Sequence, residues 1–428
     1  MMRNLILSTV ILISIGCTNH LGAEDPAART TQPVLQASTS ENKSPWSVYD
    51  PDPGHPWNRV FRQLYRRTTA DGDGQEYGAN ELDPLLWFDT TYLLNGPSHE
   101  EALQVLDEFL SSHAENLIRD PLKRAMFQRD LWAVFDWSAS QAEPYPAERQ
   151  ALQERLAQII RRVALSKEQI DSLPDNYALE IRSHTFLTVA PPNGPDAPFL
   201  PPDLFQADSA WVPVGREGGP VAMTHTESFP FYGRSVFLVF VRSPGGRESS
   251  LRFIQSLNTE PHPRTAIGSR VALVRRMLLI DDQGALILSP LVETIQIRLF
   301  NPEQHFHEFE LNRIELFGGK AGGLVLNNDF FMLFMGHGDV FENPDIPDLR
   351  AEIPQICKAC HFEDSATPYS GDTSSIISYS RQPFPLPDNQ KPVLFPTSWS
   401  DEARTVIEWK RNHDTWKSLK GLWAGISP

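Results

Sequence analysis

The residues with the clearest chemical potential are the two cysteines and the histidine of Cys357-Lys358-Ala359-Cys360-His361, which match the C-x-x-C-H spacing of covalent haem attachment. Two thiols one turn apart can add to the two vinyl groups on one edge of a porphyrin. The adjacent histidine then lies beneath the iron as its proximal ligand. The motif therefore predicts one covalent haem c, bound through Cys357 and Cys360 with His361 on the iron.

Two other interpretations of these residues stay open. Tetrahedral zinc bound by two cysteines and two histidines needs only one more ligand, so a distant histidine could complete a zinc site. The cysteines could also form an inert or redox-active thiol pair. Haem is the favoured interpretation, because the chain has three cysteines in all and begins with a leader typical of exported proteins.

The leader occupies residues 1–17. One basic residue precedes an apolar run from Leu5 to Ile15, which is too short to span a bilayer and is typical of a secretory signal. The small Gly16 and the following Cys17 resemble the lipobox of bacterial lipoproteins, in which the cysteine becomes the lipidated first residue of the mature chain. This resemblance implies a lipid on Cys17. The alternative is an ordinary signal peptide cleaved nearby.

Lipidation of Cys17 would leave Cys357 and Cys360 as the remaining cysteines, which excludes a structural disulfide framework. Covalent attachment also suits an exported protein, because a haem held by packing alone could be lost to the surroundings. We therefore expect the chain on the periplasmic or outer-envelope side, tethered to a membrane through its lipid.

Length and charge limit the fold and the partners. A chain of 428 residues exceeds what one core usually organises, so two or three domains are expected. Lysine and arginine number 38 against 54 aspartates and glutamates, a formal net charge of -16. Such a chain repels phosphate backbones, so nucleic acid is excluded as a partner.

Composition divides the chain after the leader into four regions. Residues 18–45 are polar and proline-containing and predict a flexible tether. Apolar residues at helical spacing predict a helical region over 46–175, and strand-like runs predict a mainly β region over 176–345. Residues 346–428 carry the haem motif. The expected fold class is α+β and multidomain, with an antiparallel β middle region.

Local signals place several elements. Ser98 with Glu101, and Ser166 with Gln169, form capping-box patterns that predict helix starts. The runs RSVFLVFVRS and SRVALVRRMLLI predict strands, and the second is followed by the turn signal of residues 281–284. These patterns favour helices first and an antiparallel sheet afterwards.

The last part of the chain predicts one closing helix, capped by Ser400 and reaching about Trp423. At helical spacing, Trp409 and His413 share a face with Trp416 and Trp423. His413 on this aromatic face is a candidate distal ligand for a buried haem.

The motif and its setting resemble the c-type cytochromes of the bacterial envelope. This resemblance implies that Cys357 and Cys360 form the thioethers, that His361 is the proximal ligand, and that the C-terminal region is a small cytochrome c-like haem segment. The usual distal methionine after the motif is missing, since no methionine follows Met335. The sixth ligand therefore stays open, and a five-coordinate iron is one alternative.

A wider similarity concerns uncharacterised envelope proteins that place a β region and a histidine-glycine turn before a single C-terminal C-x-x-C-H. The matching residues are ALVRRMLLIDDQG, FELNRIELFGGKAGG, His337-Gly338 and the haem motif. This similarity implies a haem without implying an activity, and it favours His337 over His413 as the distal ligand.

The sequence therefore predicts a membrane-anchored monohaem c-type cytochrome that transfers electrons between redox partner proteins. The sequence does not indicate which proteins these partners are. A haem-dependent peroxidase-like enzyme is one alternative, because simple electron carriers rarely need so large a non-haem part. A haem sensor or binding lipoprotein is another. Each shares the haem and differs in what the rest of the chain does.

Overall fold

The computed structural model describes one compact unit, which begins after the predicted leader and nearly all of the predicted tether. The described residues are 45–68, 76–80, 82–83, 90–140, 144–189, 197–227, 231–259, 266–300, 305–327, 341 and 393–424. None of the helices within these ranges is long and apolar enough to cross a membrane.

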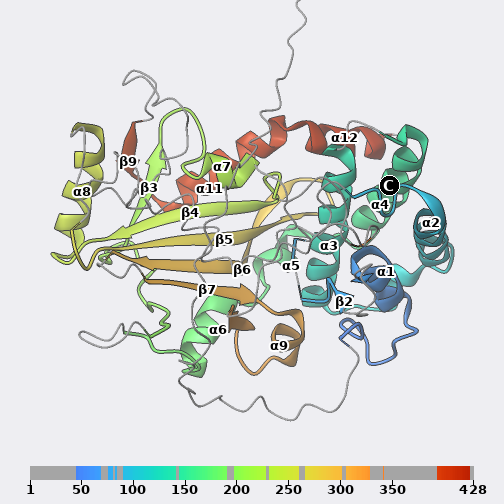
Figure 1. The fold of residues 1–428 in the computed structure, drawn as a ribbon, viewed down its shortest axis with the longest axis horizontal. Coiled ribbons are helices and arrows are strands. Elements are labelled where there is room, and N and C mark those ends of the chain that lie inside the picture. The colour runs from blue at the N-terminus through green and yellow to red at the C-terminus, as the bar shows by residue number, and fades with distance from the viewer. Residues whose placement is uncertain are drawn as a thin grey trace, which may run out of the picture. The chain divides into compact units, whose positions relative to one another are not determined.

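Helices form the first part of the unit, as the apolar spacing predicts. They are α1 (Pro56–Tyr65), α2 (Gly96–Ser111), α3 (Pro121–Ser140), α4 (Pro146–Arg162) and α5 (Lys167–Asp171), with a 3-10 turn η2 (Ala114–Asn116). Two short strands, β1 (Arg67–Thr68) and β2 (Glu76–Tyr77), pair antiparallel between α1 and α2. Figure 1 shows α1 to α4 gathered at one end of the molecule.

The predicted capping boxes have different outcomes. Ser166 caps α5 by accepting a hydrogen bond from the backbone of Gln169, whose side chain returns to the backbone of Ser166. At α2 the prediction is wrong, because the helix already begins at Gly96 and Ser98 lies inside its first turn. Pro97, with its fixed φ, lies in the first turn of the helix, which starts three residues earlier than a cap at Ser98 would place it.

An antiparallel sheet of seven strands forms the second part, again as predicted. The strands are β3 (Val212–Arg216), β4 (Ser235–Arg242), β5 (Arg270–Ile280), β6 (Leu286–Leu299), β7 (His305–Leu311), β8 (Leu324–Leu326) and β9 (Leu394–Pro396), in the spatial order β8-β7-β6-β5-β4-β3-β9. The predicted turn at residues 281–284 joins β5 to β6, where the backbone N–H of Asp281 donates to Ala285 and Gly284 has a φ of 74°.

Helices also interrupt the β region: α6 (Asn176–Ser183), α7 (Met223–Glu227), α8 (Arg247–Thr259) and α9 (Arg313–Gly318). The chain closes with α11 (Trp399–Asn412) and α12 (Asp414–Ala424). The prediction of one closing helix capped by Ser400 is therefore wrong. Ser398 is the cap, and His413 breaks the helix because its backbone is extended, with a ψ of 144°.

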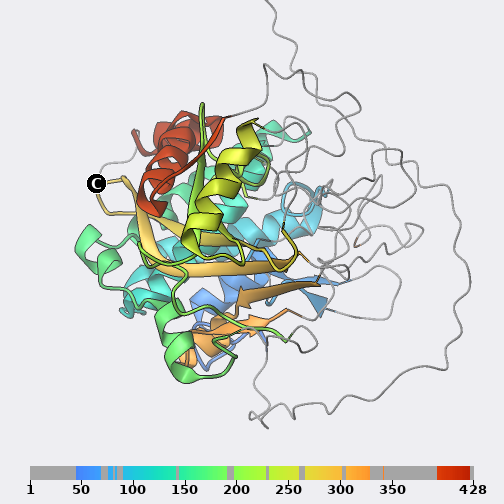
Figure 2. The same ribbon diagram turned by 90° about the vertical axis from the view of Figure 1, so that its left-hand side faces the viewer.

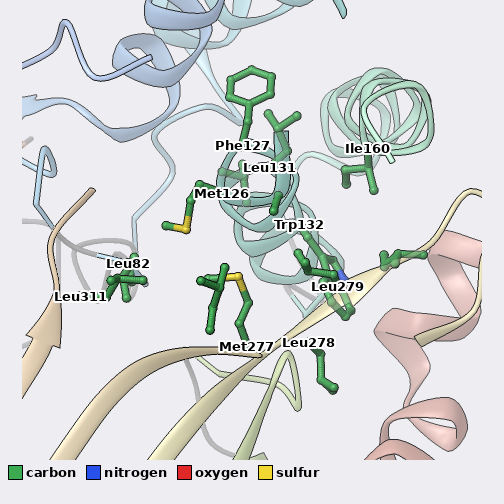
Figure 3. Close-up of a cluster of buried hydrophobic side chains, with 14 of the residues drawn as sticks. Leu82, Met126, Phe127, Leu131, Trp132, Ile160, Met277, Leu278, Leu279 and Leu311 are labelled. Carbon is green, nitrogen blue, oxygen red and sulfur yellow. The ribbon is translucent and has the colours of Figure 1, made fainter. Parts of the chain in front are cut away.

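One hydrophobic core joins the helices to the sheet. Trp132 on α3 lies beside Leu279 of β5, whereas Phe127 and Leu131 point from the same helix away from the sheet (Figure 3). Helix α3 is buried along most of its length from Ala125 to Ser138, which is typical of a central helix.

The two faces of the sheet differ in what covers them. The core face carries Val236, Leu238 and Phe240 of β4 and belongs to the main hydrophobic core. The opposite face of β3 and β4 packs against α8 in a smaller core that includes Val241 and Ile254. Helices α11 and α8 therefore lie on opposite sides of β3, as Figure 2 shows.

Candidate functional site

Most residues of the predicted haem site lie outside the described part of the chain. These are His337, Cys357, Cys360 and His361, and Cys17, the predicted lipidation site, also lies outside it. Their roles in lipidation, thioether formation and iron binding stay predictions. Within the described ranges there is no cluster of three or more histidine, cysteine, aspartate or glutamate side chains able to hold a metal ion.

His413 is the predicted ligand that the structure does describe. Its Nδ1 accepts a hydrogen bond from the backbone N–H of Thr415 at 3.3 Å and lies 3.0 Å from the hydroxyl of that residue. Its ring lies 4.9 Å from the ring of Trp409, centroid to centroid. Burial, with the nearby Lys410, lowers the pKa of His413, which favours the neutral imidazole that binds metals. The occupied Nδ1 leaves Nε2 as the nitrogen that could bind iron.

A group of buried charges is linked by ion pairs in the described part of the chain, and we call it the charge network. Its members are Asp83, Arg129, Asp136, Arg234, Arg275, Glu293 and Lys410. Arg129 and Asp136 lie on α3, Arg275 on β5, Glu293 on β6 and Lys410 on α11. Arg234 directly precedes β4, and Asp83 lies after β2. The network therefore joins parts of the chain that are far apart in sequence.

Asp83 is the centre of the network. Its carboxylate accepts hydrogen bonds from Arg129 at 2.7 and 2.8 Å and from Arg234 at 2.8 Å, and it pairs with Arg275 at 2.9 Å. Burial would raise the pKa of Asp83, but the three arginines outweigh it and hold this pKa well below its usual range. Asp83 is therefore a permanent anion.

Glu293 and Asp136 complete the pairing. Glu293 accepts from Arg129 Nε at 2.8 Å, lies 3.1 Å from Arg275 Nε, and accepts the hydroxyl of Ser235. Asp136 accepts from Arg234 at 3.1 Å and from Lys410 at 2.7 Å. Four cations thus meet three carboxylates.

Lys410 fastens the C-terminal helices to this network. Its ammonium donates to Asp136, to the backbone carbonyl of Tyr232 at 2.7 Å and to the hydroxyl of Thr415 at 2.9 Å, which uses all its hydrogens. Burial lowers the pKa of Lys410 to about 8, although Asp136 acts in the opposite direction.

Asp130 and Arg313 form a second buried ion pair beside the network, at 2.5 Å. Asp130 also accepts the hydroxyl of Tyr49, and its backbone carbonyl accepts that of Tyr65 at 3.0 Å. The guanidinium of Arg313 lies 5.1 Å from the ring of Phe61. This pair holds α9 to α1 and α3.

A polar stripe runs across β5, β6 and β7 on the face opposite the core face. We call this stripe the polar face; its residues are Arg275, Thr294, Gln296, Arg298, Glu308 and Glu310. Glu308 is 5% exposed, and Gln296, its cross-strand partner, donates to its Oε1 at 3.2 Å. Burial raises the pKa of Glu308 to about 7, which places its titration near neutral pH.

Sequence reasoning missed the charge network, although α3 carried a signal. The stretch QRDLWAVFDW places Arg129, Asp130 and Asp136 among large apolar residues on every side of one helix. Charges within an all-round apolar helix must be buried, and buried charges need partners. The partners themselves could not be predicted, because they come from other parts of the chain.

Comparison with known proteins identifies no relative. No known protein family, no curated protein and no solved structure matches this chain. The function must therefore be inferred from the residues of this chain alone.

Proposed function

We propose that this protein is a membrane-anchored monohaem c-type cytochrome that transfers electrons in the bacterial envelope. The observation that carries the proposal is the C-x-x-C-H motif of residues 357–361 in a chain whose leader ends in a lipobox-like Gly16-Cys17. Cys357 and Cys360 would hold the haem by thioethers, and His361 would bind the iron. When bound, the haem supplies reversible one-electron chemistry.

The structure describes the elements that lie before and after the motif segment in the chain. The chain leaves the sheet after β8, carries the motif, and returns to the same sheet as β9, where Leu394 pairs with Arg216 of β3. Helices α11 and α12 then follow, fastened by Lys410.

The sixth iron ligand would be His337 or His413, and a five-coordinate iron is the alternative. The wider similarity to envelope proteins favours His337. His413 is favoured by its lowered pKa, which leaves the ring neutral and Nε2 able to bind iron. The lipid on Cys17 would hold the protein at a membrane, and its partners would be redox proteins of the same compartment.

The test is a reduced-minus-oxidised spectrum with haem-stained electrophoresis of the full chain, produced with a cytochrome c maturation system. We expect a covalent haem that is lost in the Cys357→Ala, Cys360→Ala double variant. His361→Ala should keep the covalent haem but change the spectrum. Cys17→Ser is the matched control, since it should release the protein from the membrane and keep the haem. A wild-type protein without covalent haem would refute the proposal.

The same sample separates the alternatives. A five-coordinate iron that binds cyanide or carbon monoxide would favour the peroxidase-like enzyme. The reason to consider such an enzyme is the large non-haem part of the chain. Elemental analysis that finds one zinc ion per chain and no iron would favour the zinc site.

A further inference from the structure

Strand β9 lies at one edge of the sheet, so one side of its backbone has no neighbouring strand within the described part of the chain. The backbone N–H of Glu217 donates to the carbonyl of Val393 at 2.9 Å. In the register of β3 and β9, this bond makes Arg216 and Leu394 a non-hydrogen-bonded pair. The N–H and C=O of Leu394 therefore point away from β3, toward the position of a further strand.

The side chain of Asn258, near the end of α8, occupies this position. Its Oδ1 accepts the N–H of Leu394 at 2.8 Å, and its Nδ2 donates to the carbonyl of the same residue at 2.6 Å. An amide side chain carries the donor and acceptor of a peptide group, so Asn258 pairs with Leu394 as a residue of a neighbouring strand would. Figure 1 shows α8 and β9 at the same end of the sheet.

Pro396 deals with the next outward position of β9. It lies opposite Val214 in the register, so its nitrogen points away from β3 as that of Leu394 does. Proline has no N–H, and this is why it is common on edge strands. The outward N–H groups of β9 are therefore either bound by Asn258 or absent.

The opposite edge of the sheet has a similar arrangement at one position. The N–H of Asn312 donates to the carbonyl of Gly323 at 2.8 Å, which directs the N–H of Leu324 on β8 away from β7. This N–H donates to Oε2 of the buried Glu180 on α6 at 3.2 Å. Each edge strand thus has a helix side chain at a place where another strand could pair.

The side chains around Leu394 make the edge of β9 prone to pairing. Val393 and Phe395 are 45% and 39% exposed, and β9 carries no charged residue, although charges usually protect an edge strand. Two copies related by a two-fold axis at Leu394 could exchange both outward hydrogen bonds of this residue. Val393 of each copy would then lie opposite Phe395 of the other, a favourable cross-strand pair. The edge is therefore complementary to itself.

We propose that Asn258 is a plug in a strand-addition site at the edge of β9. The occupant that it excludes is β9 of a second copy of this chain. Asn258 holds the one outward donor and the acceptor of Leu394 that such a strand would use, so the contact is autoinhibitory and keeps two copies apart.

Sedimentation of the full-length protein tests the proposal. Asn258→Ala removes both hydrogen bonds to Leu394, and we expect its molar mass to double with rising protein concentration while the wild type stays a monomer. Gln255→Ala, a change of an exposed amide on the same helix, is the matched control and should behave as the wild type. A folded Asn258→Ala protein that stays monomeric would overturn the proposal, as would a wild type that already pairs through β9.

Two more variants separate the loss of the plug from a loss of stability. Asn258→Asp keeps an acceptor for the N–H of Leu394 and puts a charge at the edge, so it should stay monomeric although it loses the donor. Val393→Lys adds an edge lysine and should return the Asn258→Ala protein to a monomer. If Asn258→Asp pairs as readily as Asn258→Ala, or if Val393→Lys changes nothing, the plug is not what prevents pairing.

Hydrogen exchange of the Leu394 amide locates the contact. In dilute Asn258→Ala this amide has lost its acceptor and should exchange about fivefold faster than in the wild type, the effect of losing one ordinary hydrogen bond. In concentrated Asn258→Ala it should be protected again, because the carbonyl of Leu394 in the second copy accepts it. A dimer in which this amide stays unprotected would place the interface elsewhere and refute the proposal.

Discussion

Replacement of Lys410 by methionine removes the ammonium that joins the C-terminal helices to the charge network. Methionine has a similar length and no charge, so the change tests the ion pair rather than the packing. Asp136 keeps Arg234 at 3.1 Å but loses its closer partner at 2.7 Å. The carbonyl of Tyr232 and the hydroxyl of Thr415 also lose a donor.

Two effects of opposite sign set the size of the loss. Removing one partner of a buried ion pair costs about 3–5 kcal/mol, because the other charge stays buried. The remaining Arg234 reduces this cost, since it still pairs with Asp136. We therefore expect Lys410→Met to lower the free energy of unfolding by about 3 kcal/mol at pH 7, the lower end of that range.

Urea unfolding followed by circular dichroism measures this loss, and a double-mutant cycle isolates the pair. Lys410→Met, Asp136→Asn and the double variant should be non-additive, with a coupling free energy of about 2 kcal/mol. A loss below about 1 kcal/mol for Lys410→Met, or additive effects in the double variant, would refute the view that this ion pair fastens α11 to α3.

The same variant makes a pH prediction whose sign follows from the lowered pKa of Lys410. Because that pKa falls from 10.5 to about 8, the folded protein releases the proton first, and between these values the unfolded chain binds more protons. The free energy of unfolding of the wild type should therefore rise relative to that of Lys410→Met as the pH increases from 8 to 10.5. A constant difference across this window would contradict the lowered pKa.

Two further predictions concern other elements. Burial raises the pKa of Glu402 to about 7, so the folded state holds this proton more tightly than the unfolded chain and loses stability as the pH rises from about 4.5 through 7. Glu402→Gln should therefore be more stable than the wild type at pH 8 but not at pH 4. Thermal unfolding of both proteins at the two pH values checks this prediction. Ser166→Ala removes the cap of α5 and should lower the free energy of unfolding by about 1 kcal/mol in urea titration, whereas Ser172→Ala, just after the same helix, is the control and should change it less.

Local patterns in the sequence were sufficient where neighbouring residues decide the structure. The cap at Ser166 and the turn at residues 281–284 depend on contacts within a few residues, and the structure confirms both. The apolar spacing also predicted the helices before residue 175 and the antiparallel sheet after it. Short-range hydrogen bonds and side-chain periodicity are properties of a segment, so the segment reveals them.

Local patterns were insufficient where two signals competed. Ser98 has the residue types of a cap, but Pro97 lets the helix begin earlier. The segment from Trp399 to Ala424 has continuous helical spacing, yet it breaks at His413. At the start of α12, Thr415 bonds to both Lys410 and His413, and these contacts accompany the break.

The sequence by itself contains the features on which the proposed chemistry rests: a C-x-x-C-H motif, a lipobox-like leader and a formal net charge of -16. Only the tertiary structure decided which charges meet. Asp83, Arg129, Arg275 and Glu293 have no local pattern in common, and the fold brings them into pairs. Covalent chemistry depends on the spacing of a few adjacent residues, whereas burial and pairing depend on contacts between distant ones.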